Sequence, residues 1–467
     1  MSERLTIHPH VLLPAAEPAR GVAAQLYGEV ARLPIVSPHG HVDAGLLAND
    51  MPFQDAAALL VTPDHYVTRL LHAHGVGLEE LRPPADPRAT WRRLCEHWPL
   101  LAGTVVRLWL ELMLHDVLGV RTAPSAGSAD MLFDELSGVL ARPESRPRAL
   151  YRRFGIELLA TTDDPADDLR HHAALAADPS WSGRVVPTFR PDAYLDVARP
   201  GWPAQIERLA AAADLTIDSY DAFIDALERR RGFFAEHGAT ATDHGVERLD
   251  TERLGDRTAR RIFAAALRGD ARPQEAAAFA AHMLDEMARM SCQDGLVMQL
   301  HPGVARNHHG PTLRAHGPDA GADIPLRAEF TSALRPLLQR YGTHPRLRIV
   351  LYTVDETTFS RELAPLAGFY PSVHVGAPWW FLDSPDGMLR FRRAVTDTIG
   401  FHRTAGFVDD ARALCSIPAR HEVARRVDCA FLAHLVCEHR LSLDEGAAVA
   451  RDLARNQALR VFGPATR

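Results

Sequence analysis

Short apolar runs alternate with long helical segments along the whole chain. After each run comes a cluster of polar residues, then a stretch rich in Ala, Leu and Arg whose apolar positions recur with helical period. The runs occupy residues 33–37, 156–162, 184–189, 238–243, 295–301, 346–353, 372–377 and 404–409. Eight strand–helix units, with connections long enough for parallel crossovers, predict an α/β fold, a TIM-like (β/α)8 barrel.

The spacing of these runs has one exception. About 120 residues separate the first run from the second, and most of them are helix-forming. The pattern predicts one barrel domain over residues 1–467, with a large helical insertion at about 45–150. An insertion after strand one would lie at the carboxyl mouth of the barrel, where loops form the active site. The Trp and Leu stripe of this segment, including Trp91, Trp98 and Trp109, is interpreted as packing.

Composition and charge exclude several classes of protein. Hydrophobic residues make up 46% and charged residues 24%, as in a globular protein. The net charge is −7 without a basic block, which argues against a nucleic-acid partner. The same composition is compatible with a small anionic substrate held by individual arginines.

The chain contains no lysine, so all 52 residues of the combined lysine and arginine count are arginines. Schiff-base catalysis, pyridoxal-phosphate anchoring and a phosphate-loop lysine are therefore excluded. A carbamylated lysine bridging two metals is excluded for the same reason. Any carbonyl or metal chemistry must use His, Asp, Glu, Tyr and Arg.

The five cysteines form no CxxC pair and are odd in number, which favours a reduced protein without a disulfide framework. The first residues lack the basic and apolar regions of a signal peptide. No apolar stretch approaches the ~18 residues of a membrane span. We expect a cytoplasmic protein without a membrane partner.

A metal site is suggested where the first run ends. His39 and His41 are two residues apart, so on an extended chain both imidazoles point to one face and could bind one divalent metal. Two other His-x-His pairs, at residues 8–10 and 72–74, do not follow a strand-like run. The alternative is a pair of surface histidines.

A third ligand must come from another strand end. Asp409 and Asp410 close the eighth run, and strand eight neighbours strand one in a closed barrel. His301 closes the fifth run, and the pair Asp243-His244 closes the fourth. For these last three a structural role is an equally good interpretation.

Arginines near strand ends form a second group of candidates: Arg190, Arg306 and Arg412. Guanidinium groups bind carboxylates in a bidentate manner, so this group predicts an acidic substrate. His65 and Tyr66, inside the insertion, form a possible acid–base pair. Taken singly, each of these residues is also compatible with a surface or helix-start role.

Taken together, the segments resemble the uronate isomerase family, a branch of the amidohydrolase superfamily. The resemblance extends through nearly the whole chain in the right order and is carried by LPIVSPHGH, DHYVTR, FGIELLATTDDPADDL, VVPTFRPD, LVMQLHPGVARN, WWFLDSPDGML and DDARALCSIPARHE.

The resemblance implies a barrel with one divalent metal, typically zinc, with manganese as the alternative. The ligands would be His39, His41 and a strand-eight aspartate. The family shows Asp-x-Arg followed by Ser six residues after the Asp, which fits Asp410 with Arg412 and Ser416.

The resemblance also implies roles for other residues. The His-Tyr pair of the family corresponds to His65 and Tyr66, its strand-three arginine to Arg190, and its aromatic pair to Trp379-Trp380. With Asp410, His65 and Tyr66 would be catalytic. Arg190, Arg412, His301, Trp380 and Arg306 would bind substrate. Ser37-Pro38 before the first histidine, and Gly40 between the two, depart from the usual pattern.

The reaction implied is aldose–ketose isomerisation of D-glucuronate to D-fructuronate, or of D-galacturonate to D-tagaturonate, through an enediol. A homo-oligomer is expected from the same resemblance. The alternative is a mononuclear metal-dependent hydrolase of the same superfamily, which would use the same three ligands. A scaffold protein that had lost its metal would lack ligands, yet all three are present.

Overall fold

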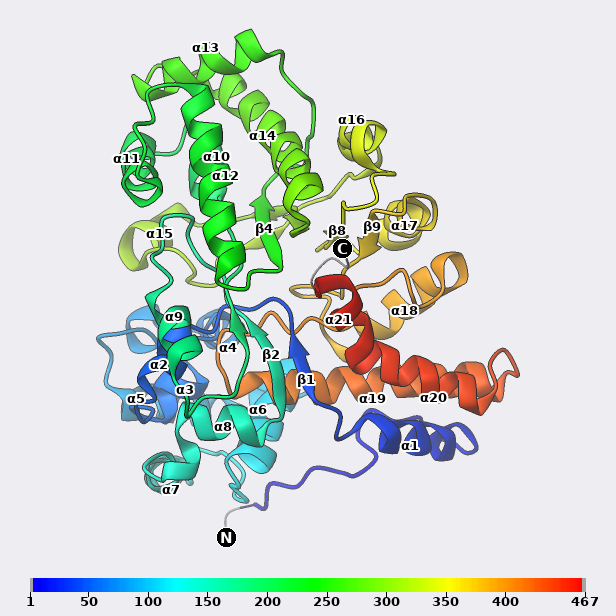
Figure 1. The fold of residues 1–467 in the computed structure, drawn as a ribbon. Helices are drawn as coiled ribbons and strands as arrows, with labels where there is room; N and C mark the ends of the chain where they lie inside the picture. Colours follow the sequence, from blue (N-terminus) through cyan, green and yellow to red (C-terminus); the bar gives the residue numbers. More distant parts are fainter. Residues whose placement is uncertain (1–2, 464–467) are drawn as a thin grey trace.

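Parallel strands form the centre of the protein (Figure 1), and the computed structural model describes residues 3–463. The strands are β1 Ile35–Ser37, β2 Ile156–Ala160, β3 Val185–Val186, β4 Ala241–Val246, β5 Val297–Pro302, β6 Val304–Ala305, β7 Ile324–Pro325, β8 Ile349–Leu351 and β9 Val373–Val375. One parallel sheet has the order β1-β2-β3 and a second the order β4-β5-β8-β9. The predicted α/β class with parallel strands is confirmed.

Seven of the eight predicted runs contain a strand. The eighth run, 404–409, joins the sheet only through a parallel bridge between Val375 and Thr404. Phe189 forms bridges to Asp163 and to Thr242, so it links the two parallel sheets. The antiparallel pair β6–β7 was not predicted, because strands of two residues leave no periodic pattern.

The segment between β1 and β2 is mainly helical and packs at one side of the molecule (blue to cyan in Figure 1). Its helices are α2 Ala44–Asn49, α3 Ala56–Leu60, α4 His65–Ala73, α5 Pro87–Glu96, α6 Val105–Leu112, α7 Ala129–Leu140 and α8 Pro147–Arg153. These helices contribute many members of the largest hydrophobic cluster, which also contains residues of the strands.

The remaining helices surround the strands, and α11 to α14 project at the opposite end of the molecule (green in Figure 1). They are α1 Ala19–Val30, α9 Arg170–Ala177, α10 Asp192–Leu195, α11 Trp202–Ala213, α12 Tyr220–Glu236, α13 Asp256–Leu267, α14 Pro273–Asp294, α15 Gly310–His316, α16 Thr331–Tyr341, α17 Ala364–Phe369, α18 Pro385–Ile399, α19 Ser416–Cys437, α20 Leu443–Arg451 and α21 Gln457–Phe462.

Side-chain caps set the starts of several helices, and two of these helices lie beside the site described below. Asp64 accepts a hydrogen bond from Tyr66 N at 2.8 Å and begins α4, which places His65 and Tyr66 in its first turn. Ser384 accepts from Gly387 N and begins α18. Such caps satisfy backbone donors that have no partner within the helix, typically contributing about 1 kcal/mol.

The long helix α19 connects distant parts of the chain. Most of its side chains are buried, and it packs against α1 and α18. Tyr27 of α1 donates to Glu422 of α19 at 2.5 Å, and Arg425 donates to the carbonyl of Leu33 just before β1 at 2.7 Å. The helix α19 therefore holds α1 and the residues just before β1 against the last quarter of the chain.

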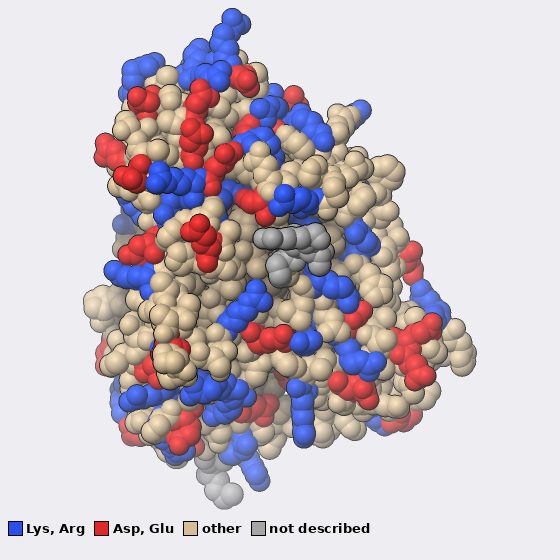
Figure 2. Space-filling view, viewed as in Figure 1, with Lys and Arg blue, Asp and Glu red and all other residues tan. Residues whose placement is uncertain are grey.

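On the face shown in Figure 2, arginine and acidic side chains are interspersed. All five cysteines are free, as the sequence predicted. Within residues 3–463, no helix combines the length and apolarity that crossing a membrane requires.

Gly376 lies against the ring of Tyr352, and a Cβ there would be 2.5 Å from that ring. Tyr352 in turn stacks on His301, with ring centroids 4.1 Å apart. We expect Gly376→Ala to lower the free energy of unfolding by about 1–3 kcal/mol through overpacking, measured by urea denaturation.

Gly232→Ala in α12 is the control, because its added Cβ would meet nothing within 4 Å. A glycine inside a helix is less favourable than alanine by roughly 0.5–1 kcal/mol, so this change should be neutral or stabilising. Equal losses in the two variants would contradict the packing argument.

Candidate active site

A polar cleft brings together the site residues that the family resemblance implies, whereas the candidates Asp409 and His244 do not line it. Its empty volume is about 650 Å³. The predicted residues in its wall are His39, His41, His65, Tyr66, Arg190, His301, Arg306, Trp380, Asp410 and Arg412. Asp383 and Arg420 also line the cleft and were not singled out from the sequence.

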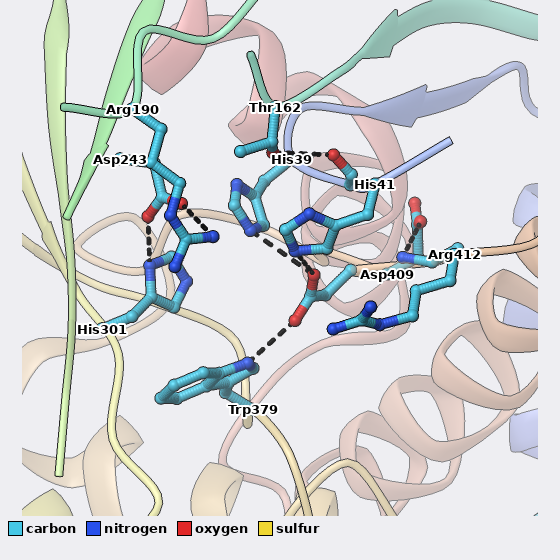
Figure 3. Close-up of polar contacts among 12 residues, drawn as sticks. His39, His41, Thr162, Arg190, Asp243, His301, Trp379, Asp409 and Arg412 are labelled. Atoms are coloured by element: carbon cyan, nitrogen blue, oxygen red, sulfur yellow. Dashed lines mark hydrogen bonds and ion pairs between the residues drawn. The ribbon is translucent and has the colours of Figure 1, made fainter. Parts of the chain in front are cut away.

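His39 and His41 point toward one carboxylate (Figure 3), which the distances identify as that of Asp410. His41 Nε2 lies 3.1 Å and His39 Nε2 lies 3.4 Å from Asp410 Oδ1. Asp410 Oδ1 is buried and accepts no well-aligned hydrogen bond from these two nitrogens, while Trp379 Nε1 donates to Oδ2 at 2.8 Å. Two imidazole nitrogens and a carboxylate oxygen are a zinc-type donor set, so these residues fit one divalent metal.

The backbone around Gly40 permits this geometry. His41 N donates to the carbonyl of Ala411 at 2.8 Å, and a Cβ on Gly40 would be 3.3 Å from the same oxygen. Thr162 Oγ1 donates to the Gly40 carbonyl at 2.9 Å. Asp410 has a left-handed φ of 45°. The chain after β1 and the chain at 409–411 therefore meet closely.

Charge in this group favours an ionised aspartate. Burial alone would raise the pKa of Asp410, but His41 and His39 outweigh burial and hold the pKa well below its ordinary value. Burial lowers the pKa of His41, despite the neighbouring carboxylate. Burial would also lower the pKa of His39, but Asp243 and Asp410 outweigh burial and raise it. Metal binding requires an ionised carboxylate and neutral imidazoles, so a bound cation would take the place of a proton on His39.

A second group, His39, Asp243 and His301, also has donor atoms close together. Here Asp243 is already paired on both sides (Figure 3), with His301 Nδ1 at 2.7 Å and Arg190 Nη1 at 3.1 Å. A guanidinium at this distance disfavours a second cation. The arrangement instead keeps the proton of His301 on Nδ1, and His301 Nε2 is buried without a partner.

His65 lies between two aromatic rings. It stacks on Tyr66 with ring centroids 5.3 Å apart and meets the Trp380 ring edge-on at 4.8 Å. Burial, followed by the charge of Arg412, lowers the pKa of His65 to about 3. The ring is therefore neutral near pH 7, and both nitrogens are buried without partners.

The three arginines that the sequence predicted for the cleft differ in how tightly they are held. Arg190 Nε lies 2.8 Å from Asp192, in addition to its contact with Asp243. The nearest carboxylate oxygen to Arg412 is 3.5 Å away and the nearest to Arg306 is 3.8 Å away. Arg412 and Arg306 thus have more donors free for an anion.

Parallel strands, with two imidazoles and a carboxylate grouped beside several guanidinium groups in one cleft, place the chain among α/β proteins with a candidate metal-binding site. A sequence model of glucuronate isomerase matches residues 18–462, so the chain belongs to the glucuronate isomerase family.

Individual relatives agree with this assignment. A uronate isomerase from Rhizorhabdus wittichii is 53% identical, over 96% of this chain and 97% of that protein. The crystal structure of glucuronate isomerase from Caulobacter crescentus has a TM-score of 0.97 and 46% identity, covering 100% of this chain and 98% of that one. Uronate isomerase from Thermotoga maritima has a TM-score of 0.93 and 29% identity, covering 98% and 99%. The resemblance drawn from the sequence and the assignment as an isomerase are confirmed.

Breaking the Asp243 contacts should destabilise the protein. Asp243→Asn removes the charge that faces Arg190 and His301. We expect the free energy of unfolding to fall by about 2–3 kcal/mol. This is less than for a fully buried pair, because Arg190 is partly exposed to solvent and still pairs with Asp192. Urea denaturation measures it.

Asp221→Asn is the control, since its pair with Arg260 is more than half exposed on both sides. That change should cost less than about 1 kcal/mol. An Asp243→Asn loss as small as that of the control would show that the cleft pair is not structural.

Proposed function

We propose that this isomerase interconverts D-glucuronate with D-fructuronate, D-galacturonate with D-tagaturonate, or both. The observation that carries the proposal is the convergence of His39, His41 and Asp410 at one point of the cleft. The membership of the chain in the glucuronate isomerase family supports it.

We assign one divalent metal, zinc with manganese as the alternative, to His39, His41 and Asp410. Trp379 would orient Asp410 through its hydrogen bond to the second carboxylate oxygen. When bound, the metal supplies Lewis-acid stabilisation of charge that develops on substrate oxygens.

The isomerisation must move one proton from C2 to C1 and one from the oxygen at C2 to the oxygen at C1. Asp410 is assigned as the base at C2, because the carboxylate is held ionised. Tyr66 is assigned to the oxygen protons. His65 is neutral, so its role is a hydrogen bond to the sugar rather than acid catalysis by imidazolium.

The substrate carboxylate is assigned to guanidinium groups of the cleft. Arg412 suits this role because its nearest carboxylate oxygen is 3.5 Å away, whereas Arg190 is already paired with two carboxylates. Arg190, Arg306, His301 and Trp380 would contact the sugar from the surrounding wall.

We also propose that the strands close into a (β/α)8 barrel, with residues of about 45–150 as a helical insertion in one domain. The bridges of Phe189, the bridge from Val375 to Thr404 and the hydrogen bond from His41 N to the Ala411 carbonyl support a closed ring. In this arrangement α4 belongs to the insertion and brings Tyr66 to the mouth.

The chain is further proposed to act in the cytoplasm as a homo-oligomer, on small-molecule substrates and without a nucleic-acid or membrane partner. The free cysteines are compatible with a reducing compartment. Sedimentation equilibrium would measure the oligomeric state.

The reaction is tested by proton NMR of metal-replete protein with D-glucuronate, and separately with D-galacturonate, in D2O. We expect new 2-keto sugar signals with no gain of a water molecule by mass spectrometry. Partial deuterium at C1 would agree with an enediol path. Asp410→Asn should abolish the signals. A product heavier by one water would instead indicate the mononuclear hydrolase.

The ligand assignment is tested by metal content. We expect wild type to hold about one equivalent of metal. His41→Ala should lose it, and Trp379→Phe should weaken affinity by about 10–100-fold, as loss of an outer partner does. His65→Ala is the control and should keep the metal. Full metal in His41→Ala would refute the assignment.

A further inference from the structure

The hydroxyl of Tyr66 has a defined set of partners. It donates to Asp383 Oδ1 at 2.8 Å and accepts from Phe381 N at 3.0 Å. A phenol has one proton and two lone pairs. Its proton is therefore committed to Asp383, and one lone pair remains. In this arrangement Tyr66 can accept a hydrogen bond from a sugar hydroxyl but cannot donate one to a carbonyl.

Asp383 is held in turn by a buried arginine. Arg420 of α19 donates from Nη1 to Asp383 Oδ2 at 2.9 Å and to the carbonyl of Asp409 at 3.3 Å. The guanidinium also lies over the ring of Trp109, 3.9 Å from its centroid. Arg420, Asp383 and Tyr66 are 6%, 8% and 9% exposed. Three distant segments thus meet in one buried row.

The electrostatics of Arg420, Asp383 and Tyr66 allow Asp383 to accept a proton. Burial raises the pKa of Asp383, and Arg420 opposes the rise without cancelling it. Burial, and then the charge of Asp383, raises the pKa of Tyr66 well above its ordinary value. A lasting phenolate is thus disfavoured, and any proton that Tyr66 releases needs the adjacent carboxylate as its acceptor.

We propose that Asp383 is the positioning residue of Tyr66, fixing its hydroxyl as an acceptor and taking its proton while Tyr66 receives one from the sugar. This inference rests on the proposed isomerisation. The O–H bond at C2 breaks as a new O–H bond forms on Tyr66, whose original proton moves to Asp383 Oδ1. Reversal returns the proton from Asp383 to Tyr66 and delivers one to the oxygen at C1. Protons balance, and no external oxidant or reductant is needed.

The test is a double-mutant cycle on the metal-loaded full chain with the faster hexuronate. Asp383→Asn keeps the size of the side chain and removes the charge. We expect kcat to fall by about 100-fold, within the range for positioned proton transfer, with KM changed by less than about threefold. In a Tyr66→Phe background the same change should cause no further loss of kcat. Full additivity of the two losses would overturn the proposal, as would an unchanged kcat in Asp383→Asn.

Asp428→Asn is the matched control. Asp428 forms a second buried Asp–Arg pair between α18 and α19, with Arg392 Nε at 2.6 Å and Nη2 at 2.9 Å. Loss of that charge should leave kcat unchanged, whereas an equal fall would indicate a general packing effect and overturn the proposal.

Asp383→Glu replaces Asp383→Asn in the cycle if the latter does not fold, because it keeps a charge for Arg420. A kcat deficit that disappears in the Tyr66→Phe background supports the proposal; an undiminished deficit, or a wild-type kcat, overturns it. Wild type that isomerises no hexuronate would overturn the proposed function as well, so the two failures are distinguishable.

Discussion

The contact between the end of β1 and the segment 409–411 is the constraint on which the rest of the site depends. It combines the hydrogen bond from His41 N to the Ala411 carbonyl with the convergence of two imidazoles on Asp410. Gly40 permits the approach, since a Cβ would stand 3.3 Å from the carbonyl oxygen. The cleft surrounds this contact. Trp379 holds the Asp410 carboxylate through a hydrogen bond, and the other polar side chains line the wall around it.

A second constraint is that this chain, which has arginine but no lysine, holds several charged side chains at low solvent exposure. Each buried carboxylate near the cleft has a specific partner, as Asp243 has Arg190 and Asp383 has Arg420. Guanidinium groups suit this purpose because they stay charged and present several donors in a fixed plane. Arg412, by contrast, has no carboxylate oxygen nearer than 3.5 Å. Arg190 and Arg420 therefore hold buried carboxylates, whereas Arg412 has donors available to bind an anion.

The sequence predicted the strands well where burial on both faces gives continuous apolar runs, and poorly where pairing is minimal, as in β6, β7 and the run 404–409. Strand-end position was enough to propose His39 and His41, but the choice between Asp409 and Asp410 needed the family resemblance. Structurally the two differ, because Asp409 faces His421 at 3.1 Å while Asp410 faces the histidine pair. Asp383 and Arg420 were missed because only tertiary packing brings them to Tyr66.

The atoms proposed as metal ligands come from distant parts of the sequence, about 370 residues apart. Closing a loop of this length carries an entropic cost that nearby contacts do not, so we expect these contacts to form late in folding. During synthesis, His39 and His41 leave the ribosome long before Asp410 does, and the helices between β1 and β2 can pack in the interval. A tightly held metal ion would then report that the chain has been made at least as far as Asp410 and that its first and last quarters have docked.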